Sequence, residues 1–170
     1  MEDNLPVVSI LMGSDSDLEL CKDVMETLDK FGVSYEVRVI SAHRDTESCV
    51  NYAKTAKERG IKVIIAAAGM SAHLAGVVSA NTLLPVIGIP LCRTSLLGLD
   101  ALFSIIEMPP GIPVAAVGID SSANAAFVAM RILALLDKDL SDKLTLYSKK
   151  MKTELKERQK KLDWRLKGGN

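Results

Sequence analysis

The sequence has few of the residues that mark several common classes of protein. Its 170 residues include three cysteines, two histidines and one tryptophan, and aromatic residues make up 4%. No apolar run is long enough to span a bilayer, and no segment has the order of a signal peptide. The cysteines are odd in number and lack metal-ligand spacing. They predict reduced, mostly buried thiols in a cytoplasmic protein without a bound metal.

Neither sign of charge dominates the chain. Lys and Arg together number 21, and so do Asp and Glu. No overall electric field therefore points to nucleic acid or a membrane surface as a partner. The G-x-x-x-x-G-K-[ST] phosphate loop is absent, which argues against nucleoside triphosphate hydrolysis. A flavin site is disfavoured as well, because too few aromatic residues are present to form its walls.

Short apolar runs alternate with amphipathic segments over most of the chain. The strands are expected at 7–12, 34–40, 62–68, 85–89 and 114–117, and the helices at 18–31, 46–59, 74–81, 99–106 and 122–136. This alternation predicts a five-stranded parallel sheet covered on both faces, which is a flavodoxin-like three-layer α/β sandwich. Strand 34–40 alternates apolar and polar residues, so it is expected near the sheet edge.

The end of the chain differs from the rest. Residues 1–138 are predicted to form the α/β domain, and 139–170 a long, charged helical extension. One face of this extension carries an apolar stripe of Leu144, Tyr147, Met151, Leu155, Leu162 and Leu166. We expect the stripe to pack on the domain's own flank or on another subunit, and the lysines to form a solvated face.

Three polar loops are expected to meet at one edge of the sheet. Ligands of open parallel sheets bind beyond the carboxyl ends of the strands, where the strand order reverses. With the order 2-1-3-4-5, loops 13–17 and 69–73 face each other across that crevice, and loop 41–44 lies beside them. Both histidines, His43 and His73, fall in these loops. Their placement favours a functional role over a structural one.

The residue types in two of these loops suit an anionic ligand. Loop 13–17 reads G-S-D-S-D and offers hydroxyls, carboxylates and free backbone N–H groups at a helix start. It could hold a phosphate and sugar hydroxyls, or its side chains could simply cap the helix. Arg44 suggests an anion ligand, because a guanidinium can bind a phosphate through two hydrogen bonds. A surface salt bridge is the alternative for this residue.

Several motifs together resemble the PurE family of purine biosynthesis. They are G-S-D-S-D at 13–17, S-A-H-R at 41–44, A-H-L at 72–74, L-P-V-I-G-I-P at 84–90, M-P-x-G-I-P-V at 108–114 and A-N-A-A at 123–126. The resemblance covers about residues 7–136. It implies an enzyme that acts on aminoimidazole ribonucleotide (AIR) to make the 4-carboxylated product CAIR, without a cofactor. It also implies a homo-octamer with sites at subunit boundaries.

The family has two branches, and the sequence departs from one of them. Mutases, which move the carboxylate of N5-CAIR to the ring carbon, typically read A-G-G-A-A-H where residues 68–73 read A-G-M-S-A-H. They also tend to carry Trp at the position of Leu18 and Gln at that of Glu107. Met70-Ser71 resembles the G-x-S of carboxylases that use AIR and carbon dioxide directly. We therefore expect an AIR carboxylase, with the mutase, which His73 favours, and a non-catalytic nucleotide-binding module as alternatives.

The resemblance also implies roles for individual residues. His43 is expected to remove the proton from C4 after carboxylation and to return it in the reverse reaction. Ribose and phosphate are expected to bind Ser14, Asp17, Ser41 and Arg44. The carboxyl group or carbon dioxide is expected to contact Gly69, Ser71 and His73.

Overall fold

The computed structural model describes residues 5–166 and 168. Its contacts divide the chain into two compact units, one ending at Leu133 and the other beginning at Ala134. This division lies a few residues before the sequence-based boundary between 138 and 139.

The first unit contains the predicted parallel sheet. Its strands are β1 (Val8–Met12), β2 (Tyr35–Val39), β3 (Val63–Gly69), β4 (Val86–Leu91) and β5 (Ala115–Ala116). They are hydrogen-bonded in the order β2-β1-β3-β4-β5, and every pair is parallel. The predicted order and the edge position of β2 are thus confirmed. The strand order reverses between β1 and β3, so a ligand crevice is expected there.

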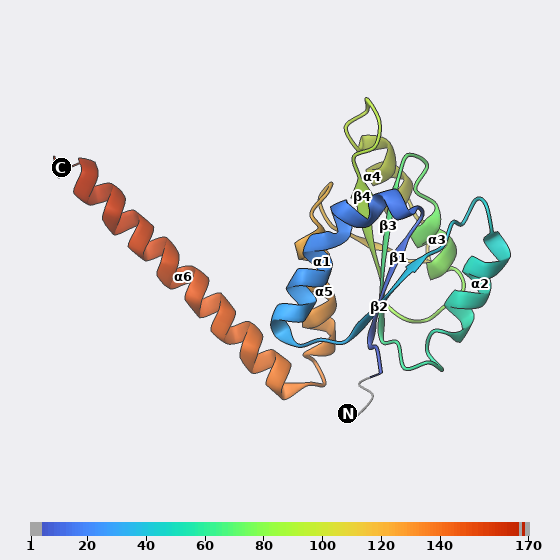
Figure 1. Cartoon of the computed structure of the whole chain (residues 1–170), viewed down its shortest axis with the longest axis horizontal. Helices are drawn as coiled ribbons and strands as arrows, with labels where there is room; N and C mark the ends of the chain where they lie inside the picture. The colour runs from blue at the N-terminus through green and yellow to red at the C-terminus, as the bar shows by residue number, and fades with distance from the viewer. Residues whose placement is uncertain (1–4, 167, 169–170) are drawn as a thin grey trace. The chain divides into compact units, whose positions relative to one another are not determined.

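Helices cover both faces of this sheet (Figure 1). On one face lie α1 (Leu18–Phe31) and α5 (Ser122–Leu133), which pack against each other. The edge-to-face contact of the Phe31 and Phe127 rings, with centroids 5.7 Å apart, joins them. A continuous apolar cluster fills the other face, between the sheet and the helices α2 (Thr46–Thr55), α3 (Leu74–Ser79) and α4 (Leu99–Ile106). The predicted three-layer sandwich is therefore correct.

Some element ends differ from the prediction for local reasons. Strand β4 was expected to stop before Pro90, but it continues to Leu91. The Pro90 carbonyl accepts a hydrogen bond from Asp120 N–H (3.0 Å) on the side of β5, and β5 has already ended at Ala116. In a strand, the N–H and the carbonyl of one residue point to the same side. The N–H that proline lacks would therefore point past the end of β5, and its absence removes no hydrogen bond between strands. Helix α2 stops at Thr55 rather than at 59, and α5 at Leu133 rather than at 136.

A partly exposed network of hydrogen bonds and ion pairs joins β2 to α2 and to Arg59, just beyond it. Glu36 accepts hydrogen bonds from the Tyr52 hydroxyl and from Arg38 (2.8 and 3.1 Å), and Arg59 Nη2 lies 3.7 Å away. Tyr52 also contacts the hydroxyl of the fully buried Ser9. Burial alone raises the pKa of Glu36, but the hydrogen bonds from Tyr52 and Arg38 and the charges of both arginines outweigh it. The pKa of Glu36 is consequently lowered.

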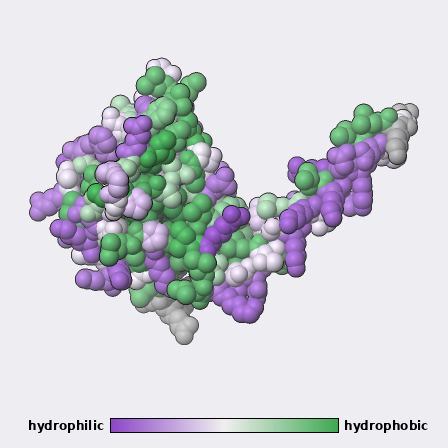
Figure 2. All heavy atoms as spheres, turned by 180° about the vertical axis from the view of Figure 1, so that it is seen from behind, coloured by the Kyte–Doolittle hydropathy of each residue, from purple (hydrophilic) through white to green (hydrophobic). Residues whose placement is uncertain are grey.

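The second unit is dominated by one long helix, α6 (Lys138–Leu166), as the sequence predicts. Lys138, Lys143 and Lys150 form i,i+4 ion pairs with acidic residues along it. Polar side chains cover most of α6 in Figure 2, with apolar ones at intervals. None of the helices in the described part of the chain combines the length and the apolarity that crossing a membrane requires.

Candidate active site

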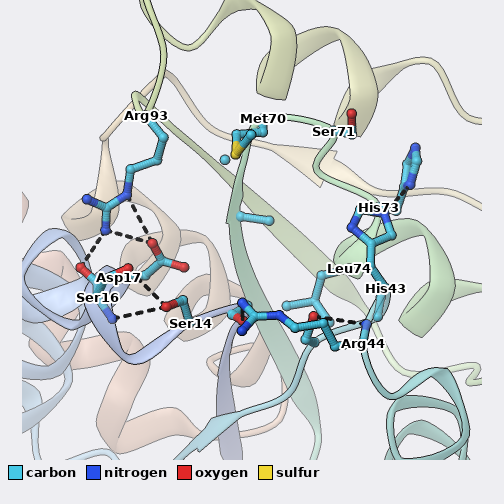
Figure 3. Close-up of a pocket in the computed structure, with 15 residues that line it drawn as sticks. Ser14, Ser16, Asp17, His43, Arg44, Met70, Ser71, His73, Leu74 and Arg93 are labelled. Carbon is cyan, nitrogen blue, oxygen red and sulfur yellow. Dashed lines mark hydrogen bonds and ion pairs between the residues drawn. The ribbon is translucent and has the colours of Figure 1, made fainter.

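A cavity of about 500 Å³ opens at the carboxyl ends of β1 and β3 (Figure 3). The loops after β1, β2 and β3, which are distant in sequence, form most of it, and Arg93, two residues after β4, lines it as well. All eight residues proposed from the sequence line this cavity: Ser14, Asp17, Ser41, His43, Arg44, Gly69, Ser71 and His73. The structure thus brings together the groups that the sequence placed on one edge of the sheet.

The first loop turns sharply out of β1 and enters the short helix η1 (Asp15–Asp17). Ser14 caps η1, because its Oγ accepts a hydrogen bond from Ser16 N–H (3.3 Å). The Ser16 hydroxyl also donates to Ser14 Oγ (3.0 Å). The capping role that the sequence left open is therefore real, and it fixes both hydroxyls at the cavity wall.

Asp17 is held by an arginine that the sequence analysis missed. Arg93 Nη2 and Nε donate to Asp17 Oδ1 at 2.6 and 3.0 Å, and Nη2 also donates to the Ser16 carbonyl. Asp17 is only 6% exposed. The neighbouring guanidinium compensates this buried carboxylate and fixes its direction, and Oδ2 stays available to accept a ligand hydroxyl.

Arg44 has a different environment from Arg93. Its Nη2 makes one long contact, 3.4 Å, to the Gly13 carbonyl, and its N–H donates to Ser41 Oγ at 3.3 Å. Within residues 5–166, no carboxylate pairs with it. The surface salt bridge considered for Arg44 is thus absent there. An uncompensated guanidinium at the cavity wall is suited to bind a phosphate.

The two histidines touch each other. His43 Nε2 and His73 Nδ1 lie 2.6 Å apart, and the rings meet edge to face with centroids 4.7 Å apart. One nitrogen must carry the proton and the other the lone pair, so the two rings share one hydrogen bond. This contact fixes the orientation of the His43 ring and engages only its Nε2, so Nδ1 remains for proton exchange with a ligand. The orienting group, which the sequence could not identify, is His73.

The loop after β3 completes the wall. A Cβ on Gly69 would lie 2.5 Å from Arg93 Cγ, so only glycine permits this close approach. Met70 follows with a positive φ of 58°, and its side chain is 60% exposed. Ala72 N–H donates to the Met70 carbonyl (3.0 Å) and His73 N–H to the Ser71 carbonyl (2.7 Å). These bonds close the tight turn that presents Ser71 and His73 to the cavity.

Cys21 is fully buried, and its thiol lies close enough to Asp17 and Arg93 to be affected by both charges. Burial, and secondarily the negative charge of Asp17, raises the pKa of its thiol to about 12, with Arg93 acting in the opposite direction. Cys21 is therefore a protonated packing residue, as predicted for the cysteines, and so is the fully buried Cys49. Cys92 is partly exposed. Among the described residues, no three His, Cys, Asp or Glu side chains cluster as metal ligands would.

Seven further residues line the cavity that were not among the eight proposed from the sequence: Gly13, Ser16, Ala42, Ala68, Met70, Leu74 and Arg93. Arg93 could have been found, because it lies two residues after β4 and carboxyl ends of strands supply ligands. The sequence-based prediction ends this strand before Pro90, so the position of Arg93 near the carboxyl end of β4 was not recognised. Met70 was noticed only as a departure from a motif, since neither its exposure nor its backbone conformation can be read from the sequence.

Together, the fold and the cavity define a flavodoxin-like α/β protein with a polar ligand site at the switch point of its sheet. The sequence profile of one such family, AIR carboxylase, matches residues 7–154. The chain belongs to this family, which is the PurE family indicated by its motifs.

Relatives of known name are similar over nearly the whole chain. A protein of Pyrococcus horikoshii named N5-carboxyaminoimidazole ribonucleotide mutase is 50% identical over 96% of this chain and 92% of its own length. A mutase of the same name from Thermotoga maritima is 47% identical over 94% and 93%. Phosphoribosylaminoimidazole carboxylase of Schizosaccharomyces pombe is 49% identical over 93% of this chain but 29% of its own length.

A solved structure gives the same fold. PurE of Treponema denticola superposes with a TM-score of 0.85 at 34% identity, over 92% of this chain and 98% of its own. The fold and family expected from the sequence are therefore confirmed. The preference for the direct carboxylase branch is not supported, because the strongly similar full-length relatives carry the mutase name.

Proposed function

We propose that the protein is an N5-carboxyaminoimidazole ribonucleotide mutase, which moves a carboxylate from the N5 nitrogen to ring carbon C4 of the ribonucleotide. The observation that carries this chemistry is the His43–His73 contact in a cavity that also holds Arg44. A proton-transferring imidazole and an anion-binding guanidinium are the two groups that the reaction needs. The names of the relatives favour the mutase over the direct carboxylase.

The proposed reaction can be balanced with one imidazole. Cleavage of the N5–carboxylate bond releases carbon dioxide and leaves the electron pair on N5, which takes a proton from cationic His43. The enamine carbon C4 then attacks the carbon dioxide and forms the new carbon–carbon bond. Neutral His43 removes the C4 proton and restores the aromatic ring. No net proton is released, and His43 returns to its starting state.

The remaining cavity residues suit the rest of the nucleotide. The guanidinium of Arg44 and the hydroxyls of Ser14 and Ser41 would bind the phosphate, and Asp17 Oδ2 would accept a ribose hydroxyl. Gly69 and Ser71 would contact the migrating carboxylate, where backbone N–H groups can stabilise negative charge. These positions hold the substrate while His73 keeps the His43 ring in one orientation.

Direct AIR carboxylase is the second candidate. It is favoured by the Met70-Ser71 sequence and by the similarity to the S. pombe carboxylase. The two functions differ in substrate, so purified protein is supplied either with N5-CAIR or with AIR plus bicarbonate. A mutase converts N5-CAIR to CAIR without added bicarbonate and uses AIR poorly. Efficient carboxylation of AIR, with N5-CAIR left unconsumed, would overturn the proposal in favour of the carboxylase.

A variant separates catalysis from mere binding. H43N should lower turnover by at least about a hundredfold, because it removes the proton-transferring group, while CAIR still binds with similar affinity. Binding is measured by calorimetry and turnover by product absorbance. If binding and turnover fall together, His43 is a structural residue. If neither changes, the protein is a non-catalytic nucleotide-binding module or uses another base.

We also propose that the chain assembles as a homo-oligomer through α6. Apolar side chains of α6 that are exposed in this chain are Leu146, Met151, Leu155, Leu162, Trp164 and Leu166. Met151, Leu155, Leu162 and Leu166 share one face of α6, whereas Leu146 and Trp164 lie on the opposite face. An exposed apolar face of this kind is typical of a protein–protein contact. Sedimentation of the full chain and of a chain truncated after Leu136 tests this. The truncated chain should sediment as a smaller species, and equal sizes would refute the role of α6.

A further inference from the structure

Met70 occupies a backbone conformation that a side chain normally avoids. Its φ of 58° lies in the left-handed region, where Cβ crowds the following carbonyl. A glycine would make the same turn out of β3 without that crowding. The Met70 side chain also gains little from burial, because 60% of it is exposed. Neither turn geometry nor packing therefore accounts for a methionine at this position.

The location of the side chain suggests what it does. Met70 lines the cavity between Gly69 and Ser71, and in Figure 3 it lies at the end of β3 between Arg93 and Ser71. Its labelled neighbours in this part of the wall are polar, so the thioether chain contributes a flexible apolar surface there. Strained residues that persist at a ligand site point to a functional constraint.

The reaction proposed above creates a need for such a surface. Between leaving N5 and joining C4, the migrating group is carbon dioxide, which is uncharged and makes weak hydrogen bonds. Arg44 and the serines retain the nucleotide, but they cannot retain carbon dioxide by charge. Escape into solvent would leave AIR as a dead-end product. An apolar side chain over the reacting end of the cavity would slow that escape.

We propose that Met70 is a specificity-determining residue that covers the carboxylate-transfer end of the cavity and retains carbon dioxide during transfer. The proposal rests on the mutase function proposed above. Met70 then controls how much carbon dioxide is transferred to C4 and how much escapes into solvent. It has no role in proton transfer, which His43 performs.

The partition is measured with M70A, M70L and the full-length wild-type protein. Each enzyme converts N5-CAIR in buffer that contains ¹³C-bicarbonate, and mass spectrometry gives the ¹³C content of CAIR and the amount of AIR released. Carbon dioxide in contact with a thioether chain makes on the order of ten atom pairs, so its loss is expected to raise AIR release per CAIR formed about fivefold in M70A. That ratio corresponds to about 1 kcal/mol. M70L, which retains an apolar chain, should leave the ratio near the wild-type value.

Leu97 supplies the matched control. It is another apolar residue with a positive φ, 55°, it is 71% exposed, and it does not line the cavity. L97A should leave the AIR-to-CAIR ratio unchanged. A larger ratio in M70A than in L97A, with rescue in M70L, supports the proposal, and thermal melts verify that each variant is folded.

Two other outcomes have separate meanings. If M70A releases no more AIR and incorporates no more ¹³C than wild type, the role of Met70 is refuted while the mutase function stands. If wild-type protein does not convert N5-CAIR at all, the proposed function itself fails.

Discussion

The Arg93–Asp17 pair allows a prediction whose size can be worked out from the structure. Arg93 Nη2 lies 2.6 Å from Asp17 Oδ1, and the two side chains are 31% and 9% exposed. At an effective dielectric constant of about 20, opposite charges at this separation attract by about 6 kcal/mol. Desolvation of the two ions offsets a large part of this attraction. Removal of both partners together is therefore expected to cost less than the sum of the two single removals.

A double-mutant cycle tests this expectation. R93M keeps the aliphatic stem that packs beside Gly69, and D17N keeps the shape of the carboxylate. We expect R93M to lower the free energy of unfolding by about 3 kcal/mol, because it leaves a buried carboxylate uncompensated. D17N should cost about 2 kcal/mol, since Arg93 is partly solvated. The double variant should cost about 3 kcal/mol, which gives a coupling energy of about 2 kcal/mol.

Urea unfolding followed by circular dichroism measures these energies at one fixed protein concentration, because assembly would add to apparent stability. The Lys22–Glu26 pair on α1, 3.8 Å apart with side chains 56% and 63% exposed, is the control. Its own cycle should show no measurable coupling. A coupling energy below about 0.5 kcal/mol for Arg93–Asp17 would show that the pair does not hold the cavity wall together.

Three further predictions concern other parts of the α/β unit. The lowered pKa of Glu36 stabilises the fold above its ordinary value of 4.5, and this stability is lost as the pH falls through the lowered value. E36Q should therefore show a weaker loss of Tm between pH 6 and pH 3 than wild type, and parallel curves would contradict this. Iodoacetamide at pH 8 should modify the partly exposed Cys92 before the buried Cys21, and peptide mass spectrometry measures both rates. Equal rates would be evidence against the burial of Cys21. M70G and L97G should each raise Tm by about 1–3 °C in a thermal melt. Glycine relieves the left-handed strain, and this gain exceeds the cost of the added entropy of the unfolded chain. A lower Tm in either variant would argue against strain at that position.

Much of the fold could be predicted because local signals agree with the tertiary structure. Helices α1 and α4 begin and end at the predicted residues, and Gly32 closes α1 in a left-handed conformation. The site could also be located in advance. In a parallel sheet the carboxyl ends of neighbouring strands lie at one edge, so residues 13–17 and 69–73 have to meet. Alternation of strands and helices fixes that edge without any knowledge of side-chain positions.

The details of the site depend on contacts that no local pattern encodes. Pro90 looks like the end of a strand, and only the short reach of β5 makes it acceptable inside β4. A strand that ends at residue 89 leaves Arg93 well beyond the predicted site, although Arg93 contacts Asp17 in the molecule. The His43–His73 contact was hidden for a different reason, since ring orientation in loops follows from the neighbouring backbone.

The branch of the family was the hardest property to predict, and the chemistry explains why. Both reactions require the removal of a proton from C4, and their substrates share the same ribose phosphate and imidazole ring. His43, Arg44 and Asp17 therefore suit either enzyme equally well. The reactions differ in the origin of carbon dioxide and in the fate of the proton, which the mutase returns to N5 and the carboxylase releases. A cavity that retains carbon dioxide favours transfer, and one that exchanges it with solvent favours direct carboxylation. If the proposed role of Met70 is correct, the cavity wall that contains Met70 sets the balance between the two reactions.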